Sequence, residues 1–112
     1  MTDDLKHKLV ERLKSIDPYK IILFGSHAYG VPNQASDVDL MVVTEDDFLP
    51  QSFAEKNEVY LRVASTIVEI EKEFPIDLIV HTRAMHQKFF EMGSQFSKKI
   101  AAEGKVLYEK AH

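Results

Sequence analysis

The sequence predicts an α+β domain in which helices pack against one small β-sheet. Short apolar runs rich in β-branched residues alternate along the chain with segments whose apolar residues recur at helical spacing. The 112 residues are 45% hydrophobic and contain only four glycines and four prolines. We therefore expect a single domain, 1–112, with enough apolar material for a core and with no linker or low-complexity tract.

The first half of the chain reads as a helix, a strand, a loop and a second strand. Residues 1–16 place leucines on one face of a predicted helix, and 20–24 form a short buried strand. The Gly-, Ser- and Asn-rich stretch 25–36 is expected to be a loop with one helical turn at 26–29. The run 38–44 is apolar almost throughout, which is typical of a strand buried on both faces.

The second half supplies the remaining helices and strands. The longest helix is expected over about 52–74, and the apolar run 76–81 forms the third strand. Shorter helices are expected over 82–92 and 97–103, and an edge strand over 105–109. The order indicates one sheet covered by helices, but the pattern leaves open whether its strands are all parallel or mixed.

Composition excludes several classes of protein. A formal net charge of −4 argues against a broad nucleic-acid-binding surface, because such domains are usually basic. Cysteine is absent, which excludes disulfides and thiolate metal sites. No early apolar run resembles a signal peptide and no stretch is long enough to span a bilayer, so we expect a cytoplasmic protein.

Two aspartates stand one residue apart at the start of the second predicted strand. Side chains at i and i+2 of a strand point to the same face, so Asp37 and Asp39 present their carboxylates side by side. At ~4 Å and an effective dielectric near 20, two such charges repel by about 4 kcal/mol. Either water relieves this repulsion at a solvated strand start, or the pair binds a hard cation such as Mg²⁺, which prefers carboxylate ligands.

Asp77 interrupts the third apolar run and is the third candidate. An aspartate in such a run is costly unless it is paired or bound to a metal. If its strand neighbours that of Asp39 and both side chains face the same side, three carboxylates converge, as in sites that hold two metal ions for phosphoryl transfer. The alternative is that Asp77 pairs with a neighbouring Lys or Arg.

The turn Gly25-Ser26 could bind a phosphate tail beside these carboxylates. Glycine allows the backbone to approach a ligand closely, and serine supplies a hydroxyl donor. By itself the dipeptide also fits a plain turn.

These features together resemble the nucleotidyltransferase superfamily that includes polymerase beta. The resemblance is carried by Gly25-Ser26, by the segment Ser-Asp-Val-Asp-Leu at 36–40 and by Asp77. The short length and the tail KIAAEGKVLYE at 99–109 are similar to the minimal nucleotidyltransferase (MNT) branch of that superfamily. The resemblance covers nearly the whole chain and implies the small mixed sheet of the polymerase-beta-like palm fold.

The resemblance implies a role for each matching position. Gly25 and Ser26 correspond to the family's triphosphate-binding turn, and Gly30 to its second glycine. Asp37 and Asp39 correspond to metal ligands. The implied cofactor is Mg²⁺, in a two-metal site, and the implied substrate is ATP.

Asp77 corresponds to the carboxylate that ligates metal and helps to activate the acceptor hydroxyl. One position departs from the family pattern: many members have Arg before the second glycine, where this chain has Tyr29. If that Arg assists the phosphates, nucleotide binding here would be weaker or organised differently. We expect Tyr29 to fill the underside of the loop rather than to stack on a base.

The resemblance also implies a partner. MNT proteins are similar to the antitoxins of two-gene modules whose toxin is a small helical HEPN protein, and some such antitoxins transfer AMP from ATP to a tyrosine of that toxin. We therefore expect a Mg²⁺-dependent nucleotidyltransferase that adenylylates (AMPylates) a cognate HEPN toxin, a type VII-like antitoxin. A homo- or hetero-oligomer is compatible with this, whereas direct binding of nucleic acid or membrane is not expected.

Two other functions remain open from the sequence. A non-catalytic antitoxin would mask the HEPN partner, with a vestigial nucleotide site. A small-molecule nucleotidyltransferase of the aminoglycoside type ranks last, because the chain is short for the second domain that such enzymes use.

Other residues have simpler predicted roles. The five histidines show no i, i+4 pair that would form a metal site, and His27 is expected to be exposed. The group Met85, Phe89, Met92 and Phe96 could form a partner surface, but core packing is the favoured interpretation.

Overall fold

The structure, a computed structural model, describes residues 1–30 and 37–111. The helices, including 3₁₀ turns η1 and η2, and the strands follow in the order α1 (Asp3–Leu13), η1 (Lys14–Ile16), β1 (Lys20–Phe24), α2 (Ser26–Tyr29), β2 (Val38–Val43), α3 (Phe53–Ala64), η2 (Ser65–Ile67), α4 (Val68–Glu71), β3 (Ile76–His81), α5 (Arg83–Glu91), α6 (Gln95–Glu103) and β4 (Lys105–Glu109). Each predicted helix and strand is present. The predicted loop over 25–36 falls partly outside the described residues, and Ser36 lies there too.

Three predicted helices differ from the structure in detail. The first, expected over 1–16, is α-helical only over Asp3–Leu13 and continues as the 3₁₀ turn η1. The long helix is divided by η2, where the hydroxyls of Ser65 and Thr66 donate to the carbonyls of Arg62 and Val63 and so compete with regular helical hydrogen bonds. The last helix begins two residues earlier than predicted, because the Ser94 hydroxyl accepts from the Ser97 N–H and caps it.

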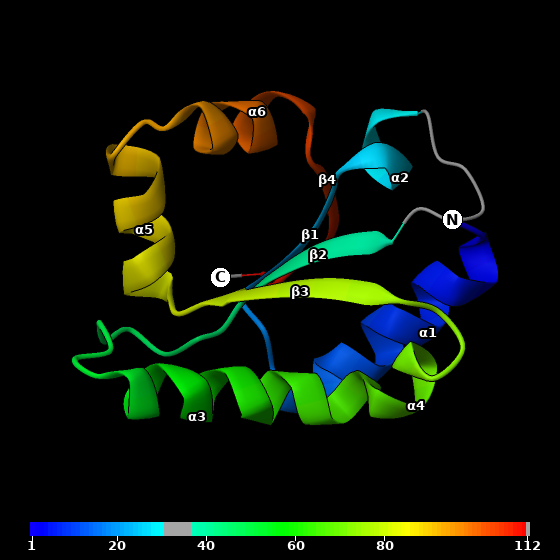
Figure 1. Cartoon of the computed structure of the whole chain (residues 1–112), viewed down its shortest axis with the longest axis horizontal. Coiled ribbons are helices and arrows are strands. Elements are labelled where there is room, and N and C mark those ends of the chain that lie inside the picture. The colour runs from blue at the N-terminus through cyan, green and yellow to red at the C-terminus, as the bar shows by residue number, and fades with distance from the viewer. Residues whose placement is uncertain (31–36, 112) are drawn as a thin grey trace.

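The four strands form one mixed sheet in the order β3-β2-β1-β4. β1 pairs antiparallel with both β2 and β4, whereas β2 and β3 are parallel. The α+β class and the small mixed sheet predicted from the sequence are confirmed, and β4 is an edge strand as expected. The connection from β2 to β3 runs through α3 and α4 on one side of the sheet (Figure 1).

The larger core lies on the face of the sheet covered by α1, α3 and α4 (Figure 1). Alternate strand residues point into this core: Ile21, Leu23, Val38, Leu40, Val42, Leu78 and Val80. The helices contribute Leu5, Leu9, Leu13, Val59, Val63, Ile67 and Ile70. This face is apolar along the length of the strands, so it leaves no place for a carboxylate.

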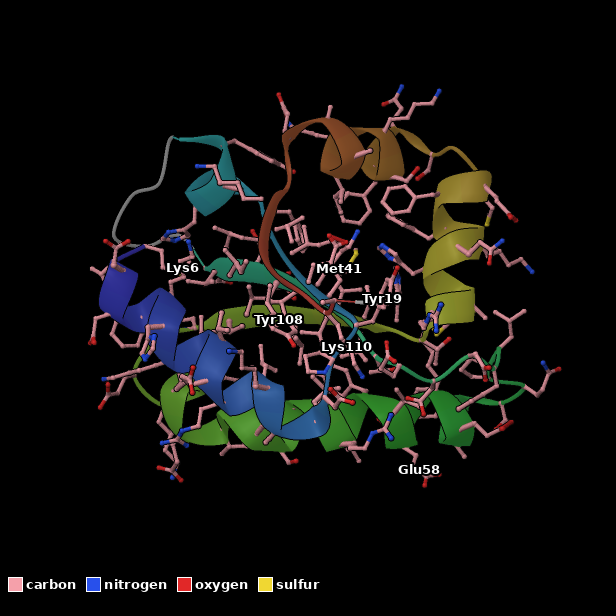
Figure 2. The ribbon with its side chains drawn as sticks, turned by 180° about the vertical axis from the view of Figure 1, so that it is seen from behind. Lys6, Tyr19, Met41, Glu58, Tyr108 and Lys110 are labelled. Carbon is pink, nitrogen blue, oxygen red and sulfur yellow. The ribbon has the colours of Figure 1, made fainter. Side chains whose placement is uncertain are left out.

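The second face of the sheet carries a smaller cluster beneath α5 and α6. It consists of Ile22, Phe24, Met41 and Ile100, and Met41 is labelled among the strands in Figure 2. Because side chains alternate along a strand, this is also the face on which Asp39 and Asp77 lie. The limited cover on this side leaves part of the sheet available for a site.

The predicted packing of the Met and Phe residues in α5 and α6 is only partly correct. Phe89 packs against the second cluster and its ring lies 5.7 Å from that of Phe96. Met92 and Phe96, in contrast, are exposed, Met92 at 75% and Phe96 at 42%. Met92 follows the end of α5, where the chain turns at Gly93 away from the core. Among the described residues, no helix is both long and apolar enough to cross a membrane.

Candidate active site

Asp39 and Asp77 stand opposite each other on the parallel strands β2 and β3. Each is the second residue of its strand, so both lie at the same end of the sheet and on the same face. The two carboxyl groups are near enough for Asp77 to raise the pKa of Asp39. The fold therefore brings the Asp39 and Asp77 side chains together, as the sequence predicts for these two aspartates.

The protonation of Asp39 reflects this crowding. Burial raises the pKa of the Asp39 carboxyl, and the charges of Asp77 and Asp37 raise it further. Sharing of a proton with the neighbouring Asp77 carboxyl acts in the same direction. His27 opposes these effects and lowers the pKa. The environment of Asp39 thus favours binding of a positive charge, whether a proton or a cation.

Asp77 is exposed, so the predicted cost of burying it does not arise. β3 is an edge strand of the sheet, and Asp77 stands near its beginning. The flanking Leu78 is buried in the larger core on the other face. The apolar run therefore reflects one buried face and not burial of the aspartate itself.

The Gly25 turn lies directly against Asp39. Gly25 directly follows Phe24, the residue of β1 that pairs with Asp39 of β2. Its φ of +73° lies in the left-handed region that favours glycine. A Cβ built on Gly25 would overlap the Asp39 carboxylate and stand 2.9 Å from its Cγ. The N–H groups of Ala28 and Tyr29 close the turn by donating to the Gly25 carbonyl. The turn predicted to bind phosphate and the carboxylates thus form one continuous surface.

The other predicted positions surround this centre. Asp37 precedes β2 by one residue, is exposed, and acts on Asp39 through its charge. Ser26 begins α2, and Gly30 ends it with a φ of +89°. Gly30 has open space where a Cβ would be. At position 30 only the backbone conformation favours glycine. At position 25 both the backbone conformation and the neighbouring Asp39 carboxylate favour it.

Two residues near the site were not assigned a role from the sequence. His27 is half-buried, not exposed as predicted, and its Nδ1 lies 3.1 Å from the terminal amino group of Met1. Lys99, on α6, holds its Nζ 4.8 Å from the centre of the Tyr29 ring. Tyr29 packs against both clusters, which agrees with the predicted underside of the loop. No linear spacing relates Lys99 to the turn, because only the packing of α6 brings it there.

The donor set suits a hard cation. Carboxylate oxygens are the preferred protein ligands of Mg²⁺, and two of them already meet at Asp39 and Asp77. Within residues 1–30 and 37–111, no three acidic or histidine side chains are gathered closely enough to hold a metal ion as they stand. Asp37 is an exposed carboxylate near this pair, and its charge acts on Asp39.

Comparison with known proteins places this geometry in a family. Residues 6–108 match the nucleotidyltransferase domain. The chain belongs to the nucleotidyltransferase domain family. It is 31% identical over 104 residues to a Methanocaldococcus jannaschii protein named "Putative protein adenylyltransferase", a match that spans 93% of this chain and 87% of that relative. This nucleotidyltransferase-family chain is accordingly an enzyme, in agreement with the prediction.

Solved structures share its fold. A toxin–antitoxin structure with AMP-PNP superposes with a TM-score of 0.57 at 20% identity, covering 94% of this chain and 73% of that one. A complex of tri-AMPylated Shewanella oneidensis HEPN toxin with MNT antitoxin gives 0.52 at 19% identity, covering 98% and 74%. At these identities the likeness establishes the nucleotidyltransferase fold, as the resemblance implied.

Proposed function

We propose that this chain transfers AMP from ATP to a tyrosine hydroxyl of a cognate HEPN toxin and thereby acts as a type VII-like antitoxin. The observation that carries the proposal is the pairing of Asp39 with Asp77 directly beside the Gly25 turn. Nucleotidyl transfer requires carboxylates that hold metal ions, next to a turn whose backbone can come close to the phosphates of the nucleotide.

Each residue then has a distinct task. Gly25 and Ser26 bind the triphosphate, and Gly30 allows the chain to leave the turn. The tyrosine oxygen attacks the α-phosphorus, and the bond from that phosphorus to the pyrophosphate oxygen breaks. Asp77, the exposed member of the pair, accepts the proton of the attacking hydroxyl, and pyrophosphate leaves.

Asp37, Asp39 and Asp77 would hold Mg²⁺, which supplies charge neutralisation at the phosphates. The raised pKa of Asp39 supports this assignment, because a cation relieves the same repulsion that otherwise favours protonation. Lys99 lies over Tyr29, the residue that replaces the family's Arg, and so offers a positive charge near the phosphate turn.

The comparisons supply the nucleotide and partner parts of the proposal. One relative is named as an adenylyltransferase, one similar structure contains AMP-PNP, and another contains an AMPylated HEPN toxin. An acceptor that arrives on a separate protein also fits a small domain whose carboxylates lie at an open end of the sheet.

The test is a transfer assay with the protein encoded beside this chain. That protein is incubated with this chain, Mg²⁺ and ATP labelled at the α-phosphate, and label on tyrosine is measured. We expect Asp39→Asn to lower the rate at least about a hundredfold. The matched control Asp3→Asn, which removes an exposed charge on α1, should leave it unchanged. Absence of label with the unmodified chain would contradict the proposal.

A non-catalytic antitoxin is the second candidate, favoured by the substitution of the family's Arg by Tyr29. Protection of cells is measured with the double variant Asp37→Asn plus Asp39→Asn. Full protection would support masking of the toxin, whereas loss of protection at unchanged expression would support transfer.

A further inference from the structure

We propose that a second pocket, at the far end of the same sheet face, binds a small organic anion carrying a phosphate or carboxylate group. The pocket has a volume of about 430 Å³ and lies between the end of β2, the start of β1 and the first turns of α5. This volume falls within the usual range for small-molecule sites. Val43, in its wall, is four residues along β2 from Asp39, a separation of about 13 Å. The second pocket is therefore distinct from the proposed transfer site, and the proposal for it does not depend on the proposed transfer activity.

Two cations line this pocket. The Arg83 guanidinium lies over the Tyr19 ring, with its Cζ 4.8 Å from the ring centre. Among the described residues, Arg83 forms no ion pair with a carboxylate. Stacking leaves the in-plane N–H donors of an arginine available for an anion. Lys20 lies 3.3 Å from Glu109 and also faces the pocket, as does the carboxylate of Asp47. Arg83 is therefore the pocket cation without an ion pair among the described residues, whereas Lys20 is paired with Glu109 and Asp47 adds a negative charge to the wall.

The beginning of α5 adds a backbone donor. The Met85 N–H donates to the Thr82 hydroxyl, and the Arg83 N–H donates to the Asp46 carbonyl at 2.7 Å. The intervening N–H of Ala84, which lines the pocket, has no partner within the described part of the chain. The first turn of a helix favours negative charge, so the dipole of α5 and Arg83 act on the same point.

His86 supplies a buried donor in the pocket wall. Its side chain is only 8% exposed, and its Nδ1 lies 3.2 Å from Nδ1 of His81. Burial, together with the charges of His81 and Lys20, lowers the pKa of His86 to about 4, so the imidazole is neutral at pH 7. When His81 donates in this pair, His86 carries its proton on Nε2, the nitrogen left to meet a ligand. An anion in the pocket selects that tautomer.

The remaining wall favours an apolar body on the ligand. The ring of Phe90 meets that of His86 edge-on at 4.7 Å, and Val43 closes the same side. A flat or apolar group can pack here while its phosphate or carboxylate reaches Arg83, Ala84 and His86.

The test is a titration of ¹⁵N-labelled chain followed by NMR, in EDTA so that no divalent cation is present. The probes are AMP, inorganic phosphate, benzoate and uncharged adenosine. We expect saturable changes at the Ala84 amide and the His86 ring nitrogens with at least one anion and none with adenosine. The phosphate and benzoate arms separate the two anionic groups. No saturable change at these positions with any anion at millimolar concentration would overturn the proposal.

Variants assign the binding to this pocket. Arg83→Gln should weaken binding about tenfold or more, because it removes a charge-assisted contact. Lys88→Gln also removes one positive charge from α5, but Lys88 does not line the pocket. This control variant should bind the anion with unchanged affinity. Asp39→Asn should also leave it unchanged. Equal weakening by Lys88→Gln, or loss of binding in Asp39→Asn, would overturn the proposal, whatever the outcome of the transfer assay.

Discussion

Gly25 lies so close to Asp39 that a Cβ on the glycine would overlap the aspartate carboxylate. The two residues come from adjacent antiparallel strands, and Gly25 follows Phe24, the register partner of Asp39. The turn and the carboxylate therefore fix each other's position. Any side chain at position 25 must displace Asp39 from its place opposite Asp77.

The first prediction compares the two glycines of the turn. Gly25→Ala should lower the free energy of unfolding by about 3 kcal/mol, because it combines strain at positive φ with the clash at Asp39. Gly30→Ala, where a Cβ meets open space, should cost only about 1 kcal/mol. Urea unfolding of both variants measures the difference. Equal costs would mean that the contact between Gly25 and Asp39 is absent.

Asp39→Asn should stabilise the fold at pH 7 while abolishing transfer. The pKa of Asp39 is raised above its ordinary value of 3.8, so ionising it opposes folding at neutral pH. Removing the charge should add about 0.5 to 1 kcal/mol to the free energy of unfolding. The gain should fade as pH falls below the ordinary pKa of 3.8, because the carboxyl then becomes protonated in both the folded and the unfolded state. A destabilised Asp39→Asn at pH 7 would contradict the repulsion inferred here.

Mg²⁺ should raise the melting temperature of the unmodified chain. A ligand at a hundred times its dissociation constant stabilises the folded state by about 2.7 kcal/mol, which corresponds to several degrees in a domain of this size. The effect should be lost in Asp39→Asn and in Asp77→Asn, with NaCl at matched ionic strength as the control. A rise that persists in both variants would place the metal elsewhere.

Stability should fall as pH decreases from about 6.5 to 4. Burial lowers the pKa of both His81 and His86 to about 4, from 6.5 in the unfolded chain, so the unfolded state binds more protons in this window. The contribution is fully present above pH 6.5. Discounted by half for partial solvent contact, the pair should lose about 2 kcal/mol between pH 7 and pH 5. His86→Phe should remove roughly half of this slope, and an unchanged slope would show that the pair is not its source.

Thr82→Ala should destabilise the chain more than Ser94→Ala. Both residues cap a helix, α5 and α6 respectively. Thr82 is also fully buried and donates to the Phe48 carbonyl at 2.7 Å, a hydrogen bond that the alanine variant loses. We expect about 2 to 3 kcal/mol for Thr82→Ala and about 1 kcal/mol for Ser94→Ala in thermal or chemical unfolding. Similar costs would show that the bond to Phe48 contributes little.

The linear pattern was sufficient where a local rule governs the outcome. Helical spacing of leucines predicted α1, and alternation along β2 placed Asp39 on the face opposite Leu40. The division of the long helix at η2 was missed, because the hydroxyls of Ser65 and Thr66 compete with the helix only in a particular geometry.

The sequence by itself determined the residue types of the candidate site and the strand that carries each, since side-chain alternation and turn chemistry are properties of a few consecutive residues. Only the tertiary structure decided that β2 and β3 are parallel neighbours in a register that sets Asp39 opposite Asp77. It likewise decided that α6 carries Lys99 to Tyr29 and that His81 meets His86. The physical reason is that strand pairing and helix docking depend on burying whole apolar faces against each other, and no short stretch of sequence encodes which faces meet.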